Sequence, residues 1–82
     1  MFNIEWTARA LKDIEKLESA IFARISQKID ELKEAPFSKD IKRLKGETSF
    51  RLRVGDYRVI FDIEGDTIFI LKVGHRKNIY DF

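Results

Sequence analysis

Residues 50–80, FRLRVGDYRVIFDIEGDTIFILKVGHRKNIY, decide the fold of this chain. Within this stretch, apolar and polar residues alternate with a period of two in three runs, which predicts strands at 50–54, 57–63 and 67–73. The dipeptide Gly55-Asp56 separates the first two runs and is a two-residue hairpin signal, because glycine supplies the positive φ that the turn needs. A second turn, at residues 64–66, predicts that the three strands pair antiparallel in succession.

The turns also predict which side chains share a face of this sheet. The first turn pairs Arg53 with Arg58, and keeping the apolar faces together then places Arg58 opposite Lys72. We expect the face that carries Phe61 to pack on helices and the face that carries Arg53 to stay open. In the third strand, the residues expected on the packed face are Thr67, Phe69, Leu71 and Val73. The open face is expected to carry aliphatic residues among its cations, namely Ile60 from the second strand and Ile68 and Ile70 from the third.

A row of three cations, Arg53, Arg58 and Lys72, is therefore expected across the open face. Like charges directly opposite each other destabilise a sheet, so such a row favours an anionic ligand, and a phosphate-rich one is the natural candidate. The alternative is a solvated surface whose long side chains extend into water, with Asp62 or Glu5 offsetting part of the charge. A protein partner could also cover the exposed aliphatic residues of this face.

The first half of the chain predicts one strand and two helices. Apolar residues alternate over residues 2–6, as in a strand, and Thr7 is suited to cap the helix that follows. Apolar residues then recur at helical spacing in two stripes, the second beginning after Ser19, a candidate cap, and ending before Pro36. With a connector over residues 37–49, the order is β-α-α-β-β-β. This order predicts an α+β fold in which a helical hairpin packs on one face of a small, mainly antiparallel sheet.

Composition narrows the function classes. The 82 residues suffice for a single domain over residues 1–82, and 44% hydrophobic residues argue for a folded chain. With no cysteine and one histidine, a disulfide framework is excluded and a metal site is not expected. No apolar run approaches the roughly 20 residues of a membrane helix, and no signal peptide is recognisable, so we expect a cytoplasmic protein. The net charge is only +2, but Lys and Arg cluster around the predicted sheet, which favours nucleic-acid binding.

Three segments of the sequence resemble a known family. Leu44-Lys45-Gly46, the run RLRVGDYRVIF at residues 51–61 and the run VGHRK at residues 73–77, at this separation, are similar to the RelE/ParE superfamily of toxin–antitoxin toxins, and closest to its RelE branch. The resemblance implies a RelE-like fold and a ribosome-dependent messenger-RNA endonuclease that cuts in the A site and inhibits translation. It implies no metal or other cofactor. The implied partners are the ribosome, mRNA and a RelB-like antitoxin, with which the toxin would form a heterodimer or heterotetramer.

The resemblance also assigns roles to individual residues. In this family the ribose 2′-hydroxyl attacks the adjacent phosphate and the 5′-oxygen leaves, so catalysis needs a base, charge stabilisation and an acid. Arg53 and Arg58 would clamp phosphate oxygens. Arg76 would assist the leaving oxygen, and Tyr80 would accept the 2′-OH proton, its pKa lowered by the surrounding arginines. Further RNA or phosphate contacts are expected from Arg51, Lys45, Lys72, His75 and Lys77, and Glu47 with His75 is an alternative acid–base pair.

Two other functions stay open at this point. A ParE-like toxin shares the fold, but it inhibits DNA gyrase and cleaves no RNA. An inactive member of the superfamily would use the basic face only to bind a partner. The joint presence of Arg53, Arg58, Arg76 and Tyr80 favours the RelE-like nuclease.

Overall fold

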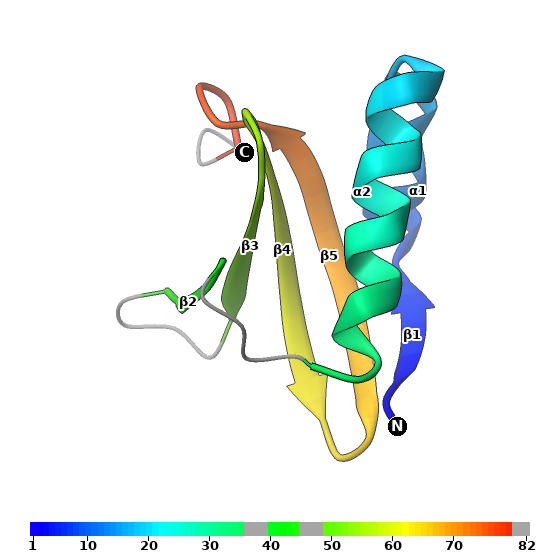
Figure 1. Cartoon of the computed structure of the whole chain (residues 1–82), viewed down its shortest axis with the longest axis vertical. Helices are drawn as coiled ribbons and strands as arrows, with labels where there is room; N and C mark the ends of the chain where they lie inside the picture. Colours follow the sequence, from blue (N-terminus) through cyan, green and yellow to red (C-terminus); the bar gives the residue numbers. More distant parts are fainter. Residues whose placement is uncertain (36–39, 45–48, 80–82) are drawn as a thin grey trace.

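The computed structural model describes residues 1–35, 40–44 and 49–79 of the chain, and Figure 1 shows their arrangement. The elements follow in the order β1 (Asn3–Trp6), α1 (Ala8–Glu15), α2 (Ser19–Leu32), β2 (Ile41–Arg43), β3 (Phe50–Val54), β4 (Tyr57–Glu64) and β5 (Thr67–His75). The five strands form one sheet in the order β1-β5-β4-β3-β2. The predicted α+β class, with a helical hairpin packed on a sheet, is confirmed.

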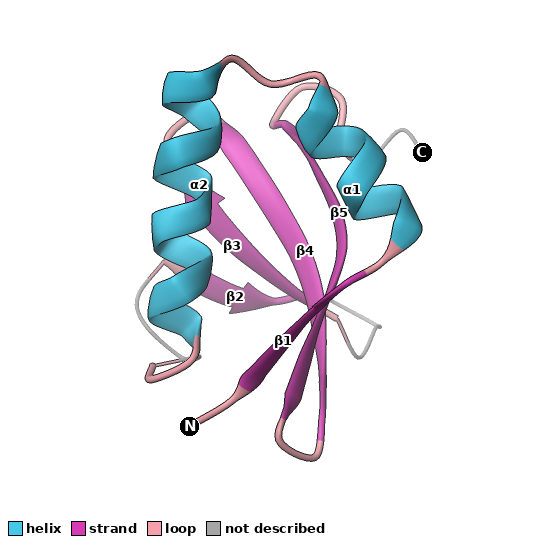
Figure 2. Ribbon diagram, turned by 90° about the vertical axis from the view of Figure 1, so that its right-hand side faces the viewer, coloured by secondary structure: helices cyan, strands magenta, loops and turns pink. Residues whose placement is uncertain are grey.

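Two features of the sheet depart from the predicted order. β1 pairs with β5 in parallel, with Ile4 opposite Ile68 and Trp6 opposite Ile70, so the sheet is mixed. The short strand β2 lies within the segment predicted as a connector and pairs antiparallel with β3. Both helices lie on one side of the sheet (Figure 2). The opposite face is therefore the one that they leave open.

A side-chain cap marks the start of α1, whereas the N-cap of α2 makes no side-chain hydrogen bond. Thr7 caps α1 as predicted, because its Oγ1 accepts a hydrogen bond of 3.2 Å from the N–H of Ala10. The N-cap of α2 is Glu18, so the cap predicted at Ser19 is wrong. α2 ends at Leu32, and Pro36, the predicted stop, lies outside the described residues. The residues that α2 buries against the sheet are Ile25, Ile29 and Leu32.

The β3–β4 hairpin has the predicted register, whereas the β4–β5 hairpin does not. Gly55 adopts φ +59° at the first turn, and Arg53 lies opposite Arg58 as expected. The second turn is also a two-residue turn, with Gly65 at φ +59°, and it places Glu64 opposite Thr67. The turn predicted at residues 64–66 would instead have placed Ile63 opposite Thr67. Because side chains alternate along a strand, this difference of one residue reverses the faces of the first half of β5.

The reversal moves two isoleucines from the predicted open face into the core. Ile68 and Ile70 are both 0% exposed and belong to the main hydrophobic cluster. The register then shifts, since Ile70 lies opposite Phe61 and Lys72 lies opposite Ile60, which makes Leu71 the extra residue of a β-bulge. The packed face predicted for Thr67, Phe69 and Leu71 is therefore wrong, whereas Val73, beyond the bulge, is in the core as predicted.

The bulge also changes the predicted row of cations. Arg58 lies opposite Gly74, so its predicted pairing with Lys72 is wrong. Ile60 lies on the open face between Arg51 and Lys72, but it is only 3% exposed. The prediction of exposed aliphatic residues on this face is therefore wrong for Ile60 as well.

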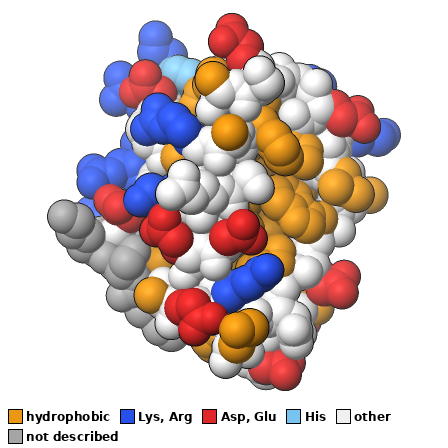
Figure 3. Space-filling view, turned by 45° about the vertical axis from the view of Figure 1, so that its right-hand side comes forward, with side chains coloured by type: hydrophobic (Ala, Val, Ile, Leu, Met, Phe, Trp, Pro, Cys, Tyr) orange, Lys and Arg blue, Asp and Glu red, His pale blue; other side chains and the backbone are white. Residues whose placement is uncertain are grey.

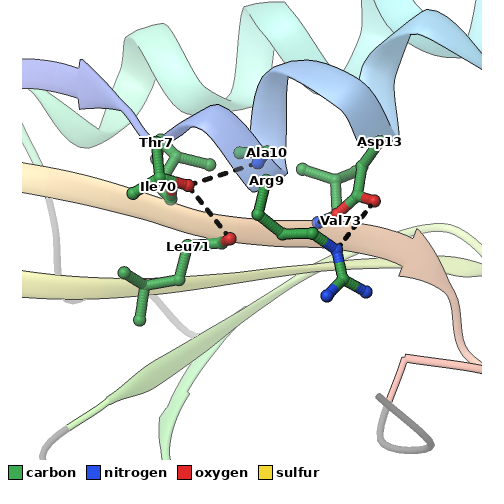
Figure 4. A network of polar contacts seen from close by, with 7 residues as sticks. All are labelled: Thr7, Arg9, Ala10, Asp13, Ile70, Leu71 and Val73. Atoms are coloured by element: carbon green, nitrogen blue, oxygen red, sulfur yellow. Dashed lines mark hydrogen bonds and ion pairs between the residues drawn. The ribbon is translucent and has the colours of Figure 1, made fainter.

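A polar network joins α1 to β5 at the bulge (Figure 4). Thr7 Oγ1 donates to the carbonyl oxygens of Ile70 and Leu71 at 2.8 and 3.1 Å. The carboxylate of Asp13, which is 9% exposed, accepts from the backbone N–H of Val73 at 2.9 Å and from Arg9 Nε at 3.2 Å. The pairing of β1 with β5 ends at Ile70, so the side chains of Asp13 and of Thr7, the N-cap of α1, satisfy the edge of β5 where β1 no longer does.

Candidate nucleic-acid interface

A basic hollow lies on the open face of the sheet, at the β2–β3–β4 side. Its volume is about 120 Å³, and it is lined by Asp40, Lys42, Arg51, Arg53 and Arg58. The strand register brings these residues together, because it places Lys42 opposite Arg51 and Arg53 opposite Arg58. Four cationic side chains around one carboxylate leave this basic hollow with a net positive charge, which suits an anion such as phosphate.

Arg53 is held from the β2 side of the basic hollow. Its Nη2 donates to Asp40 Oδ1 at 2.9 Å, and its backbone N–H donates to the carbonyl oxygen of Asp40, also at 2.9 Å. The Arg53 side chain is 59% exposed, so the ion pair is largely screened by water. Asp40 therefore fixes the direction of the guanidinium while leaving its other donors accessible.

Arg58 is held by backbone carbonyl groups. Its Nη1 donates to the carbonyl oxygens of Gly55 and Tyr57, at 2.9 Å in each case. Carbonyl oxygens orient a guanidinium without cancelling its charge. Arg58 is thus pre-positioned at the edge of the basic hollow with its full charge, which is the state that a phosphate-binding arginine requires.

Arg76 lies at the end of the sheet, beside the turn between β3 and β4. Its backbone N–H donates to the carbonyl oxygen of Asp56 at 2.8 Å, and its Nε lies 3.7 Å from Asp56 Oδ1. Figure 1 shows that the segment after β5 and the β3–β4 turn lie at the same end of the sheet. Arg76 does not line the basic hollow, but it lies two residues beyond Gly74, which faces Arg58.

His75 packs on an aromatic ring away from the basic hollow. It lies opposite Tyr57, and the two rings meet edge to face with centroids 5.4 Å apart. Its Nδ1 accepts a hydrogen bond of 3.2 Å from the backbone N–H of Lys77, which places the imidazole proton on Nε2 in the neutral form. This geometry favours a packing and turn-forming role for His75 over the phosphate contact predicted for it.

The remaining predicted residues are distributed around the interface. Lys72 lies on the open face, opposite Ile60 and one strand beyond the basic hollow. Lys77 is exposed in the turn that follows β5. The three other candidates, Lys45, Glu47 and Tyr80, lie outside the described residues. Of the predicted set, the fold therefore gathers Arg51, Arg53 and Arg58 in one place.

Two residues of the basic hollow were missed by sequence reasoning. Lys42 and Asp40 come from β2 and the residue before it, in the segment predicted as a connector. The available signal was the polar and apolar alternation of Ile41, Lys42 and Arg43, which is too short to identify a strand by itself. Pairing with β3 is what turns Lys42 toward Arg51.

The described part of the chain can also be searched for a metal site and for a membrane-spanning helix. Among residues 1–35, 40–44 and 49–79, no three His, Cys, Asp or Glu side chains lie close enough to hold a metal ion. In the same residues, no helix is long and apolar enough to span a membrane.

An apolar groove, about 440 Å³ in volume, lies on the helical side of the molecule. Its lining residues are Leu11, Ile14, Glu15, Leu17, Ser19 and Phe22. Leu11 is 47% exposed and Phe22 is 38% exposed, and Figure 3 shows hydrophobic side chains exposed on this side. Exposed apolar surface of this kind is typical of a protein-binding site.

Comparison with known proteins identifies relatives over nearly the whole chain. Residues 4–80 match the family described as "ParE toxin of type II toxin-antitoxin system, parDE". The toxin RelE3 of Methanocaldococcus jannaschii is 38% identical over 77 residues, which cover 88% of each chain.

Solved structures agree with this relationship. A chain of the RelB–RelE antitoxin–toxin complex from Methanococcus jannaschii superimposes with a TM-score of 0.77 and 35% identity, over 93% of this chain and 94% of that chain. A chain of the toxin–antitoxin complex RelBE2 from Mycobacterium tuberculosis superimposes with a TM-score of 0.81 and 30% identity, over 92% and 98% of the two chains. The predicted RelE-like fold is confirmed, and the chain belongs to the RelE/ParE family of toxins of type II toxin–antitoxin systems.

Proposed function

We propose that this toxin is an endoribonuclease that cleaves messenger RNA in the ribosomal A site and so inhibits translation. The observation that carries the proposal is the basic hollow, where Arg53 and Arg58 lie opposite each other with their guanidinium groups already oriented. Two guanidinium groups that line one hollow suit the non-bridging oxygens of an RNA phosphate. A cytoplasmic location follows from this function, because the substrate is mRNA on the ribosome.

The reaction proposed is a metal-independent transesterification. The ribose 2′-oxygen forms a bond to the adjacent phosphorus while the bond to the 5′-oxygen breaks, giving a 2′,3′-cyclic phosphate and a 5′-hydroxyl. Negative charge builds on the phosphate in the transition state, and Arg53 and Arg58 stabilise it. Arg76 stabilises the leaving 5′-oxygen. Because arginine stays protonated at ordinary pH, none of these three residues serves as the base.

Tyr80 is our candidate to accept the 2′-OH proton, and it lies outside the described residues. His75 packs against Tyr57 and its Nδ1 already accepts a backbone hydrogen bond, so only its Nε2 is available for proton transfer. We therefore retain Tyr80 as the candidate base and place His75 in support of the turn that carries Arg76.

We also propose a RelB-like antitoxin as the partner, in a heterodimer or heterotetramer. The structures of relatives described above are toxin–antitoxin complexes, which supports the assignment. The apolar groove with Leu11 and Phe22 gives an amphipathic antitoxin segment a surface to bury. An acidic segment of the same partner would be attracted to the basic hollow.

Two alternatives are tested by the same experiment. The matching family description names ParE, which favours inhibition of DNA gyrase as a second candidate function. An inactive member that only binds its partner is the third. A RelE-like nuclease requires the arginines of the basic hollow for RNA cleavage, whereas neither alternative cuts RNA at all.

The experiment is translation of a defined message in a cell-free extract, followed by primer extension. Wild-type protein should produce cuts within codons only when ribosomes are present. Arg76→Ala and Arg58→Ala should abolish the cuts, and Lys33→Ala, which removes a charge remote from the interface, should keep them. Intact messages with wild-type protein would reject the nuclease, and a gyrase supercoiling assay would then separate a ParE-like toxin from a binding-only member.

A further inference from the structure

A small pocket lies at the tip of the β3–β4 hairpin, on the side that faces α2. Its volume is about 170 Å³, and its lining residues are Ile21, Arg24, Ile25, Val54, Asp56 and Tyr57. The three aliphatic residues and the Tyr57 ring supply apolar walls, and the polar groups at the pocket are a guanidinium and a carboxylate. This tip pocket is distinct from the basic hollow, with which it shares no lining residue.

The arginine of the tip pocket reaches it from the helix. A side chain placed on Gly55 would put its Cβ only 3.1 Å from Arg24 Nη2 and 3.4 Å from Nη1, so the guanidinium lies over the turn where glycine leaves room. Two other arginines contact the same turn, since Arg58 Nη1 donates to the carbonyl oxygen of Gly55 and the Arg76 N–H donates to that of Asp56. The turn therefore connects the tip pocket to Arg58 of the basic hollow and to Arg76.

The carboxylate of the tip pocket is available for a ligand. Asp56 is 69% exposed, and its ion pair with Arg76 spans 3.7 Å, a geometry that contributes little stability in water. A carboxylate accepts hydrogen bonds from paired N–H donors, and an arginine donates to paired acceptors. Apolar walls that bury a flat ring, with these two groups at its edge, match the recognition of an unstacked nucleobase.

The geometry points to the tip pocket as a nucleobase-binding site that selects guanine in single-stranded RNA. Guanine presents N1–H and N2–H donors for Asp56, and O6 and N7 acceptors for Arg24. Adenine would turn the lone pair of its N1 toward the carboxylate, so it is disfavoured. Because Asp56 also lies beside Arg76, a base held here leaves its sugar and phosphate at the end of the sheet where Arg76 lies.

This inference rests on the RNA-cleaving function proposed above, and it adds a determinant of sequence preference. The test uses two fluorescein-labelled 2′-O-methyl RNA pentamers, UUGUU and UUAUU. The methyl group removes the attacking 2′-hydroxyl, so fluorescence anisotropy measures binding without cleavage. We expect wild-type protein to bind UUGUU about tenfold more tightly than UUAUU, the preference of one bidentate contact.

Two variants and a control assign that preference to the tip pocket. Arg24→Met and Asp56→Asn should each bring the ratio of the two affinities close to one. Lys33→Met also removes one positive charge, but Lys33 is the C-cap of α2, at the opposite end of the helix from the tip pocket. This variant should leave the ratio unchanged. Circular dichroism melting curves show that each variant is folded before its binding is compared.

The outcomes separate this inference from the proposed function. Equal affinity of wild-type protein for the two pentamers, or an unchanged ratio in Arg24→Met, overturns the guanine pocket. Cuts within codons in the translation extract would still support the nuclease in that case. If Arg24→Met keeps the ratio and weakens only the binding of an antitoxin, the tip pocket is a protein contact and the inference is wrong.

Discussion

Replacing Asp13 with alanine should destabilise the fold more than any other single carboxylate change on α1. Asp13 is 9% exposed, and its Oδ2 accepts the buried N–H of Val73 at 2.9 Å. The alanine variant leaves that N–H without its acceptor, in a place where water has little access. Loss of a buried acceptor costs roughly 1–3 kcal/mol, and hydrogen bonds to charged groups lie in the upper part of this range.

The assay is urea and thermal unfolding followed by circular dichroism. For a domain of this size, a loss of about 2 kcal/mol lowers the melting temperature by roughly 8–16 °C. Asp13→Asn keeps an oxygen acceptor and loses the ion pair with Arg9, whose side chain is 46% exposed, so its effect should be smaller. Glu15→Ala, an exposed position of the same helix, is the matched control. Similar stability of Asp13→Ala and Glu15→Ala would refute the role assigned to the network.

Three further predictions concern the surfaces of the molecule. Lys42→Gln should weaken the binding of a 2′-O-methyl RNA in anisotropy titrations, whereas Arg43→Gln should not, because the two neighbouring side chains lie on opposite faces of β2. Arg58→Lys should reduce the yield of cut message in a timed primer-extension assay by about 10²-fold, since lysine keeps the charge but not the paired donors; retained activity would show that charge alone suffices. Leu11→Glu with Phe22→Glu should leave cleavage intact and weaken capture by a tagged antitoxin in a pull-down; undiminished capture would place the antitoxin elsewhere.

Local signals predicted β1, both helices, β3 to β5 and the register of one hairpin, but not β2. The period-two runs of residues 50–63 and the Gly55-Asp56 turn determined the pairing of Arg53 with Arg58, because a two-residue turn leaves one register for the flanking strands. Thr7 was identified as a cap for a similar reason, since its hydroxyl acts within one turn of helix. These features depend on residues that are close in sequence.

The errors arose where distant residues decide the conformation. In β5, Ile68, Phe69, Ile70 and Leu71 are all apolar, so alternation does not distinguish the two faces. The choice depends on the two-residue turn at Gly65 and on the bulge at Leu71. At the bulge, Thr7 donates to the carbonyl oxygen of Leu71, and Asp13 accepts from the N–H of Val73. Cross-sheet pairing likewise brought Lys42 into the basic hollow.

Two acidic residues next to the site arginines hold the basic surface in place. Asp40 orients Arg53, and Asp56 lies beside Arg76 while its backbone carbonyl group fixes the turn. Both arginine side chains are more than half exposed, so each ion pair contributes at most about 1 kcal/mol. An incoming phosphate can therefore replace either carboxylate at small cost, and a paired arginine–phosphate contact is stronger than the one lost. The exchange expected for the proposed function does not involve the backbone hydrogen bonds at Asp40 and Asp56, so we expect the arginines to stay in position while their anionic partner changes.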